Sequence, residues 1–274
     1  MLAPEFALPT AVAADRAVRT RAAAEVVAVP EGLVIRHPRL HDVHYVNAIL
    51  LDRANAGSRP KPGHILAMAD RWQGGLAHRH VVFNDDVAGE RAAAALRPYG
   101  WERRRTLYMA LSADPGTALS DPRAREISEA EMDALQFAGL REEVPEAAMR
   151  SGLADRLAAT QRALRAGTPA RCFGAGEDGG LQSMCTLFLD PDVAGAQVAM
   201  IEEVGTLLAH RRRGLARAVV GAAIRAAAAW GAQLIVVPAD ADDWPQLMYA
   251  SMGFEPLGLQ VALTLRTGSG NPSV

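Results

Sequence analysis

The chain has 274 residues, of which half are hydrophobic and 22% are charged, and its formal net charge is −2. This length can bury a sizeable core in one large or two moderate domains, and the composition is that of a globular protein. The small negative charge argues against nucleic acid as the main partner, because duplex binding requires a broad basic face.

The first half of the sequence predicts a tail followed by a small unit of strands and helices. Residues 1–30 are rich in Ala, and we expect a tail that is either mobile or a helix on the surface. Residues 31–112 form the unit, and residues 113–125, with two prolines and one glycine, are the expected linker. The unit's strands are expected at 32–36, 80–83 and 105–111, and its helices at 41–54, 65–72 and 89–99.

The second half, residues 126–266, predicts a larger α/β unit. Ser128 and Glu131 form a capping-box pattern that opens a helix through about residue 140. Further helices are expected within 145–166, 212–231 and 243–252, and strands at 170–175, 182–189, 201–208, 233–237 and 258–265. Residues 267–274 are the expected C-terminal tail. The fold class predicted from these elements is α/β.

One stretch, residues 201–231, combines a buried strand, a basic turn and a long helix. Arg211, Arg212 and Arg213 precede Gly214 at the point where the helix is expected to begin. Free backbone N–H groups and the helix dipole favour an anion at such a position. Gly214 lacks a side chain, so a phosphate oxygen can approach its backbone closely. This stretch therefore predicts a phosphate-binding turn.

Residues 211–216 fit the Arg/Gln-x-x-Gly-x-Gly/Ala signature of the GNAT superfamily of N-acetyltransferases. An acidic strand at 201–204 precedes this turn, and a strand at 233–237 follows the helix. Residues 247–254 are similar to the family's Leu-Tyr-x-x-x-Gly-Phe segment, with one residue inserted before the Tyr. The chain resembles this family over about residues 171–266.

The resemblance implies a mixed, mostly antiparallel sheet flanked by helices, with acetyl-CoA as co-substrate and no metal. It implies that the basic turn holds the pyrophosphate and that the strand before it pairs its backbone with the pantetheine arm. The residues with these implied contacts are Val204, Gly205, Thr206, Arg211, Arg212, Arg213, Gly214, Leu215, Ala216 and Arg217. Asp242 lies where many members have a coenzyme-contacting Asn, and its carboxylate departs from the family's pattern.

Amine acetylation requires a base, because an ammonium must lose a proton before it attacks the thioester. Glu202 and Glu203 lie in an otherwise apolar strand, where burial would raise a carboxyl pKa towards neutrality. Strand alternation predicts that their side chains point to opposite faces, so only one would face the cleft. The register of the family favours Glu202 as the base. Tyr249 lies at the place of the family's tyrosine, which implies that it protonates the departing thiolate.

A short internal sequence repeat suggests two related units. Tyr99, Gly100 and Trp101 follow an Ala-rich helix and lead into a strand, as Gly253 and Phe254 do near the end of the chain. This repeat resembles a tandem of two GNAT-like units. The first unit lacks the Arg-x-x-Gly-x-Gly/Ala turn and so resembles a degenerate half without a coenzyme site, whereas the second unit is intact.

Other motifs predict no further chemistry. Residues 174–179 match Gly-x-Gly-x-x-Gly, but a strand rather than a helix follows, so we expect a hairpin turn. Cys172 and Cys185 are expected to be buried thiols on neighbouring strands. The five histidines that we considered as ligands between positions 37 and 80 lack the Cys or acidic partners of a zinc site.

The resemblance to the GNAT family thus implies an acetyl-CoA-dependent N-acetyltransferase that acts on a primary amine by direct attack in a ternary complex. The acceptor, a small molecule or a peptide, is not identified by any motif. We expect a cytoplasmic, bacterial protein without a membrane or nucleic-acid partner, either a monomer or a homodimer. The alternative is a non-catalytic module that binds CoA or acyl-CoA as a sensor or scaffold.

Overall fold

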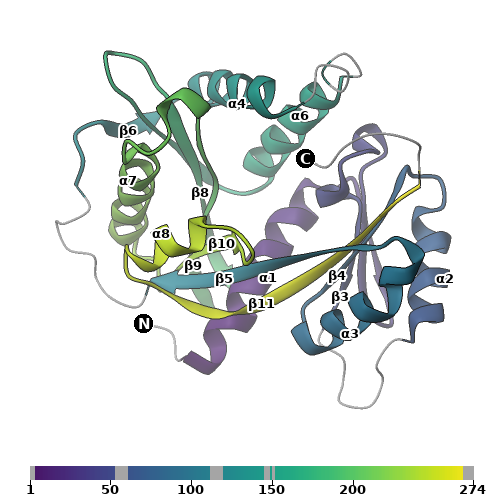
Figure 1. Cartoon of the computed structure of the whole chain (residues 1–274). Helices are drawn as coiled ribbons and strands as arrows, with labels where there is room; N and C mark the ends of the chain where they lie inside the picture. The colour runs from purple at the N-terminus through teal and green to yellow at the C-terminus, as the bar shows by residue number, and fades with distance from the viewer. Residues whose placement is uncertain (1–3, 53–60, 112–119, 145–148, 150–151, 268–274) are drawn as a thin grey trace.

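The computed structural model describes residues 4–52, 61–111, 120–144, 149 and 152–267, which form two lobes joined by one mixed sheet (Figure 1). The strands are β1 (Glu25–Val29), β2 (Gly32–Arg36), β3 (Ala48–Leu51), β4 (His78–Phe83), β5 (Glu102–Leu111), β6 (Ala124–Ile127), β7 (Ala170–Ala175), β8 (Ser183–Val193), β9 (Ala196–Thr206), β10 (Leu234–Asp240) and β11 (Phe254–Arg266). The helices are α1 (Pro4–Ala22), α2 (Pro62–Gln73), α3 (Asp86–Leu96), α4 (Glu129–Glu143), α6 (Leu153–Gly167), α7 (Leu215–Trp230) and α8 (Pro245–Ala250).

The sheet has the strand order β1-β2-β3-β4-β11-β5-β10-β9-β8-β7-β6. Its pairs are antiparallel except β3 with β4 and β9 with β10, which are parallel. The predicted mixed, mostly antiparallel sheet is therefore confirmed. Each lobe contains one of the parallel pairs, as expected if the two halves are related units.

The last strand of each half pairs with the other half. β5 comes from the first half, but it lies between β10 and β11, both from the second half. β11, the last strand of the chain, pairs with β4 of the first half. In Figure 1 these two strands run side by side across the middle of the molecule. The exchange joins both halves through continuous backbone hydrogen bonds, so the predicted halves are not separate bodies.

Of the two alternatives expected for residues 1–30, the structure contains the helix, α1, rather than a mobile tail over residues 4–22, and residues 25–29 form a strand that was not predicted. α1 contacts α6 and the faces of β9, β5 and β8, and β1 forms one edge of the sheet. The buried side chains of α1 recur every three or four residues, which is the spacing of one helix face. They are Ala7, Ala11, Ala14, Val18 and Ala22. Because these side chains are small, the helix can approach the sheet closely.

The prediction of a helix at residues 41–54 is wrong. Residues 44–46 form a single 3-10 turn, and Ala48–Leu51 is the buried strand β3. A short apolar run fits a helix face and a buried parallel strand equally well, so periodicity could not separate the two. The other predicted elements are present, with ends that differ by a few residues.

The linker and the domain boundaries remain predictions for the most part. Residues 112–119 lie outside the described residues, and β6 begins at Ala124, inside the expected linker. The two glycines of the internal sequence repeat, Gly100 and Gly253, both adopt positive φ, of 81° and 95°. Both halves therefore end a helix with a left-handed glycine before a strand, as predicted.

Two apolar cores cover the two faces of the second half of the sheet. α7 packs on one face through ten buried residues, which include Leu215, Val219 and Ile224. α1 packs on the other face, where its small residues contact Tyr108, Phe188 and Met200. Charged residues on β9 and α1 therefore lie at the border of tightly packed apolar regions.

Candidate coenzyme and catalytic site

An opening in the sheet lies between β9 and β10. The two strands pair only where Val198–Met200 face Leu234–Val236, although β9 continues to Thr206 and β10 to Asp240. Beyond the paired part, the backbone N–H and C=O groups of β9 that face β10 have no strand partner on that side within the described residues. Such an edge can pair with an extended ligand, as an added strand would.

A β-bulge at Glu203 shapes this opening. The β8/β9 register shifts between Met184 and Thr186, and Glu203 has a φ of 58° in the left-handed region. Glutamate rarely adopts this conformation, and such strain concentrates at functional sites. A bulge also redirects side chains.

The bulge overturns the prediction that Glu202 and Glu203 point to opposite faces. Thr186 lies opposite Glu202 in the β8/β9 register, so these two side chains share a face. Thr186 Oγ1 also donates a hydrogen bond to Glu203 Oε2 at 2.5 Å. Both carboxylates therefore lie on the same side of the sheet.

Glu202 lies near a buried polar cluster on α1. Burial raises its pKa to about 8, with a further increase from Asp15, while the positive charge of Arg19 opposes the shift. Arg19 and Asp15 form an ion pair at 2.9 Å with side-chain exposures of 9% and 5%. Tyr45 donates to Asp15 at 2.9 Å. A carboxyl group with this pKa can exchange a proton near neutral pH.

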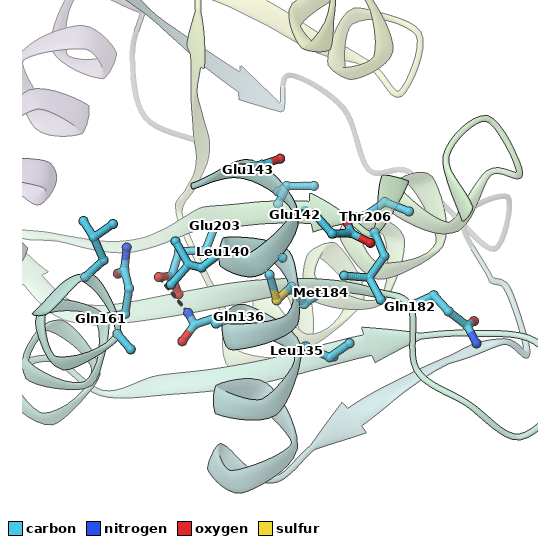
Figure 2. A pocket seen from close by; sticks show the side chains of 16 residues that line it. Leu135, Gln136, Leu140, Glu142, Glu143, Gln161, Gln182, Met184, Glu203 and Thr206 are labelled. Carbon is cyan, nitrogen blue, oxygen red and sulfur yellow. Dashed lines mark hydrogen bonds between the residues drawn. The ribbon is translucent and has the colours of Figure 1, made fainter. Parts of the chain in front are cut away.

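Glu203 lines a cavity of about 310 Å³ bounded by α4, α6, β8 and β9 (Figure 2). Its carboxylate accepts hydrogen bonds from Thr186 and from Gln136, the latter at 2.9 Å, and it pairs with Arg165 at 3.5 Å. These three donors fix the carboxylate in one orientation. Glu203 is therefore held more rigidly than Glu202.

Tyr249 lies on the opposite face, in the core beneath α7. Its ring packs edge-to-face on Phe254, with 6.0 Å between centroids. Burial raises the phenol pKa, and the nearby Cys185 and Glu202 raise it further. The phenol thus keeps its proton at neutral pH, as an acid must. Glu202, on the other face of the sheet, is close enough to contribute to this shift.

The basic turn has the geometry of an anion site. Arg212 and Gly214 both adopt positive φ, of 64° and 80°, and α7 begins at Leu215 with no side-chain cap. Within the described part of the chain, the backbone N–H groups of residues 212–217 donate to no protein acceptor. Uncapped N–H groups at a helix start favour an anionic ligand. Ala216, in the first turn of α7, has a small side chain that leaves these groups uncovered.

The arginines at the turn are mostly engaged. Arg211 pairs with Glu143 of α4 at 2.7 Å and donates to the Thr206 carbonyl. Arg217 donates to Ser251 at the end of α8. Arg212 is exposed and forms no side-chain bond with the described residues. The turn is thus tied to α4 and α8 while its backbone stays open.

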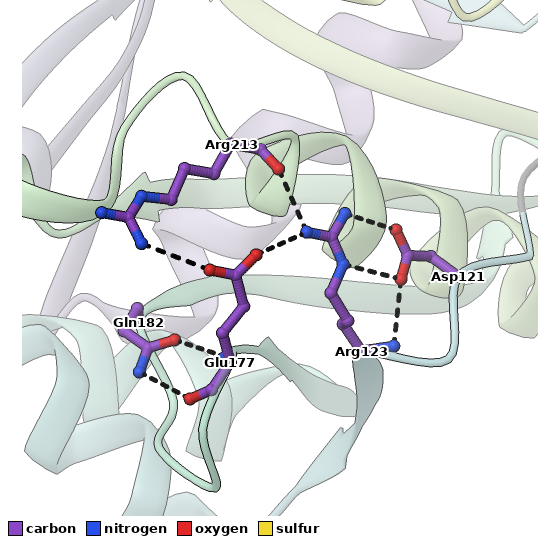
Figure 3. Close-up of polar contacts among 5 residues, drawn as sticks. All are labelled: Asp121, Arg123, Glu177, Gln182 and Arg213. Atoms are coloured by element: carbon purple, nitrogen blue, oxygen red, sulfur yellow. Dashed lines mark hydrogen bonds and ion pairs between the residues drawn. The ribbon is translucent and has the colours of Figure 1, made fainter.

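Arg123 supports the turn and was not identified from the sequence (Figure 3). It donates to the Arg213 carbonyl at 3.1 Å and to Glu177 at 2.8 Å, and Glu177 also pairs with Arg213 at 3.3 Å. Asp121 completes the cluster. Glu177 belongs to the hairpin between β7 and β8, which confirms the prediction of a hairpin at residues 174–179. No local pattern could relate Arg123 to a turn 90 positions later.

The Asp242 carboxylate forms an ion pair and is therefore not free to bind a coenzyme. Arg105 of β5 contacts it through two nitrogens, and Arg103 lies 3.9 Å away. The exchange of β5 brings these arginines beside the end of β10. The coenzyme contact implied for Asp242 therefore stays a prediction that would require this pair to rearrange.

The remaining candidates show no sign of a metal or redox site within the described residues. Cys172 faces α4 and Cys185 faces α7, and both are free and buried. His44 and His80 pack edge-to-face at 4.6 Å, and burial lowers the pKa of His44 to about 3, so its ring is neutral. The described residues hold no group of three or more His, Cys, Asp or Glu around a common point. Nor do they include a helix that could cross a membrane.

Comparison with known proteins finds a family match in the second half of the chain. Residues 130–254 match the family model of the acetyltransferase (GNAT) family. No curated protein sequence matches the chain.

Three solved structures share the fold over most of the chain. A GCN5-related N-acetyltransferase from Kribbella flavida has a TM-score of 0.61 at 20% identity and covers 96% of each chain. A conserved protein of unknown function from Staphylococcus epidermidis has a TM-score of 0.68 at 13% identity, over 89% of this chain and 94% of the other. A tandem GNAT protein from the clavulanic acid biosynthesis pathway has a TM-score of 0.51 at 16% identity, over 82% and 76%. The carboxy-terminal half of this chain therefore belongs to the GNAT family of acetyltransferases, within an overall fold that resembles a tandem GNAT protein.

Proposed function

We propose that this protein transfers an acetyl group from acetyl-CoA to a primary amine, by direct attack within a ternary complex. The observation that carries the proposal is the opening between β9 and β10, which lies between the uncapped start of α7 and the bulge at Glu203. Phosphates suit the uncapped helix start, and an extended pantetheine arm suits the open strand edge.

The coenzyme-binding residues have distinct tasks. The N–H groups of residues 212–217 bind the pyrophosphate, with the exposed guanidinium of Arg212 beside them. The open backbone edge of Val204, Gly205 and Thr206 orients the pantetheine arm. Backbone N–H groups at the bulge polarise the thioester carbonyl and stabilise the charge that develops on its oxygen.

The chemical step needs one base and one acid. Glu202 takes a proton from the acceptor's ammonium, and the neutral amine then forms a bond with the acetyl carbon. The carbon–sulfur bond breaks as the tetrahedral intermediate collapses, and Tyr249 donates its proton to the leaving thiolate. The second proton that the nitrogen loses as the amide forms returns through water to the Tyr249 phenolate, and Glu202 releases its proton to solvent. Glu202 is the better base of the two carboxylates, because three protein donors already hold Glu203.

Replacing Tyr249 by Phe tests the assignment of the acid. We expect kcat to fall about tenfold, while the Kd for acetyl-CoA stays nearly constant, because the hydroxyl contributes only in the transition state. Thiol release from acetyl-CoA with a panel of amines gives kcat, and calorimetry gives Kd. The control is Leu247→Ala on the exposed side of α8, which should change neither value. An unchanged kcat in the Phe variant would remove Tyr249 from the mechanism.

A further inference from the structure

The cavity beside Glu203 has a lining that constrains the acceptor. Its charged side chains are all carboxylates, Glu142, Glu143 and Glu203, and none of the described residues that line it is Arg, Lys or His. Leu140, Leu157 and Met184 supply apolar walls. A space of this kind suits a short alkyl chain with a cationic end, and it disfavours a carboxylate or phosphate.

The carboxylates of the lining are not equally available. Glu143 pairs with Arg211, and Glu142 accepts a hydrogen bond from the Leu208 N–H group, so both are occupied at the outer rim. Arg165, with only 2% of its side chain exposed, pairs with both Glu203 and Asp133. Asp133 also pairs with the half-exposed Arg162 at 3.3 Å. Among the described residues, Glu203 has Arg165 as its ion-pair partner, at 3.5 Å and shared with Asp133.

Burial makes the charge of Glu203 costly. The Glu203 side chain is 10% exposed, and its burial raises its pKa despite the hydrogen bond from Thr186. A buried carboxylate whose ion-pair partner is 3.5 Å away and shared with a second carboxylate has lost solvation that this partner only partly replaces. A ligand cation in the cavity would supply a closer counter-charge.

Gln161 adds to the same lining a polar side chain whose amide oxygen has no hydrogen-bond partner among the described residues. It faces the cavity from α6 in Figure 2, and its buried Oε1 atom has no hydrogen-bond donor among the described residues. A buried amide oxygen without a hydrogen-bond donor is energetically costly. An ammonium group carries three N–H donors and can bind the Gln161 amide and the Glu203 carboxylate together.

We propose that the acceptor is a short diamine, with one amino group at Glu202 for acetylation and a second, charged ammonium held by Glu203 and Gln161. This inference rests on the proposed transferase function, because it assigns the acceptor of the same site. Glu202 and Glu203 are adjacent at the bulge and lie on the same face, so the two amino groups are separated by only a few carbon atoms.

Three acceptors of equal chain length test this preference: 1,4-diaminobutane, 1-aminobutane and 4-aminobutanoate. We expect kcat/KM for 1,4-diaminobutane to exceed that for 1-aminobutane by about 100-fold. The value for 4-aminobutanoate should be the lowest, because its carboxylate would face Glu203. Equal values for the three amines would overturn the proposal and leave the transferase function intact.

Two variants test whether Glu203 and Gln161 cause the preference for the diamine over the monoamine. Glu203→Gln and Gln161→Leu should each reduce the ratio of kcat/KM for the diamine over the monoamine by about tenfold or more, with the Kd for acetyl-CoA unchanged. Glu129→Gln removes an exposed carboxylate from α4 without touching the cavity and should keep the ratio. An equal loss for both amines in Glu203→Gln would overturn the proposal, because the carboxylate would then act on the reacting amine. Gln161→Leu provides the test if Glu203→Gln does not fold.

A binding measurement separates the two proposals if no amine is acetylated. Calorimetric titration with 1,4-diaminobutane should then still show binding that Glu203→Gln weakens, which would support the cation site and contradict the transferase function. Absence of both turnover and diamine binding in folded protein would overturn both.

Discussion

Replacing Glu202 by Gln is expected to lower kcat/KM for the acceptor amine by about 10²- to 10³-fold, the usual loss on removing a general base. The pKa of Glu202 is raised to about 8, so the ionised fraction of the base increases with pH and reaches one half at about pH 8. Activity of the wild-type protein should therefore rise with pH and level off above about pH 8. The Gln variant should lose this pH-dependent limb, because Gln does not titrate.

The same substitution should stabilise the protein at alkaline pH. The folded-state pKa of Glu202 lies above its ordinary value of 4.5, so the folded protein retains a proton that the unfolded chain releases. The free energy of unfolding therefore falls as pH rises from about 4.5 to about 8, and the Gln variant avoids this loss. Urea unfolding at pH 6 and pH 9 gives the comparison.

The control for both readouts is Glu255→Gln, which removes an exposed carboxylate from β11. It should alter neither the pH profile nor the pH dependence of stability. A Glu202→Gln variant that keeps wild-type activity and the same pH limb would exclude Glu202 as the base. Glu203 or an ordered water would then be the remaining choice.

Replacing Asp15 by Ala is expected to destabilise the protein by about 3–5 kcal/mol, because it leaves the buried Arg19 without its partner. Arg19 also stacks over the Tyr45 ring at 4.0 Å, so it cannot reach solvent without breaking that contact. Urea or thermal unfolding measures the effect. Arg16→Ala on the same helix breaks only an exposed ion pair with Asp52 and should cost at most about 1 kcal/mol.

Asp15→Ala has a second consequence if the variant remains folded at low temperature. The negative charge of Asp15 raises the pKa of Glu202, whereas Arg19 lowers it. Removing Asp15 should therefore move the pH-dependent limb of activity to lower pH. A destabilisation of less than about 1 kcal/mol, the size of an exposed pair, together with an unshifted pH profile would contradict the role given to α1.

The strand, turn and helix around Gly214 were predictable because their signal is local. A strand, a basic turn with Gly214 and an apolar helix follow one another within about thirty residues, and the structure places them in that order. The capping box at Ser128 is likewise readable from the sequence and is present with both of its hydrogen bonds.

The sequence pattern that indicates α1 is weaker than the patterns at Gly214 and Ser128. Ala7, Ala11, Ala14 and Val18 have the spacing of a buried helix face, but Ala is only weakly apolar, so the same residues are also compatible with a surface tail. The i and i+4 spacing of the Asp15–Arg19 pair fits a helix, but exposed pairs have the same spacing. Nothing in the segment indicates which strands the helix covers.

Two other features depend on pairing that a sequence does not encode locally. β5 and β11 have no residue pattern that predicts their exchange between the halves. The bulge at Glu203 requires one extra residue on β9 relative to β8, and it reverses the face expected for one carboxylate. The candidate acid, base and cavity can be related to one another only after these registers are known.

Calorimetric titration with acetyl-CoA, of the wild-type protein and of Gly214→Asp and Gly214→Asn, tests whether the turn before α7 holds the coenzyme. Asp and Asn both tolerate the left-handed conformation of residue 214, so the two variants differ mainly in charge. We expect micromolar binding by the wild type, a modest loss in the Asn variant and no measurable binding in the Asp variant, whose carboxylate would repel the pyrophosphate. Folded wild-type protein that binds no acetyl-CoA, or an Asp variant that binds as tightly as the wild type, would contradict a coenzyme site at this turn.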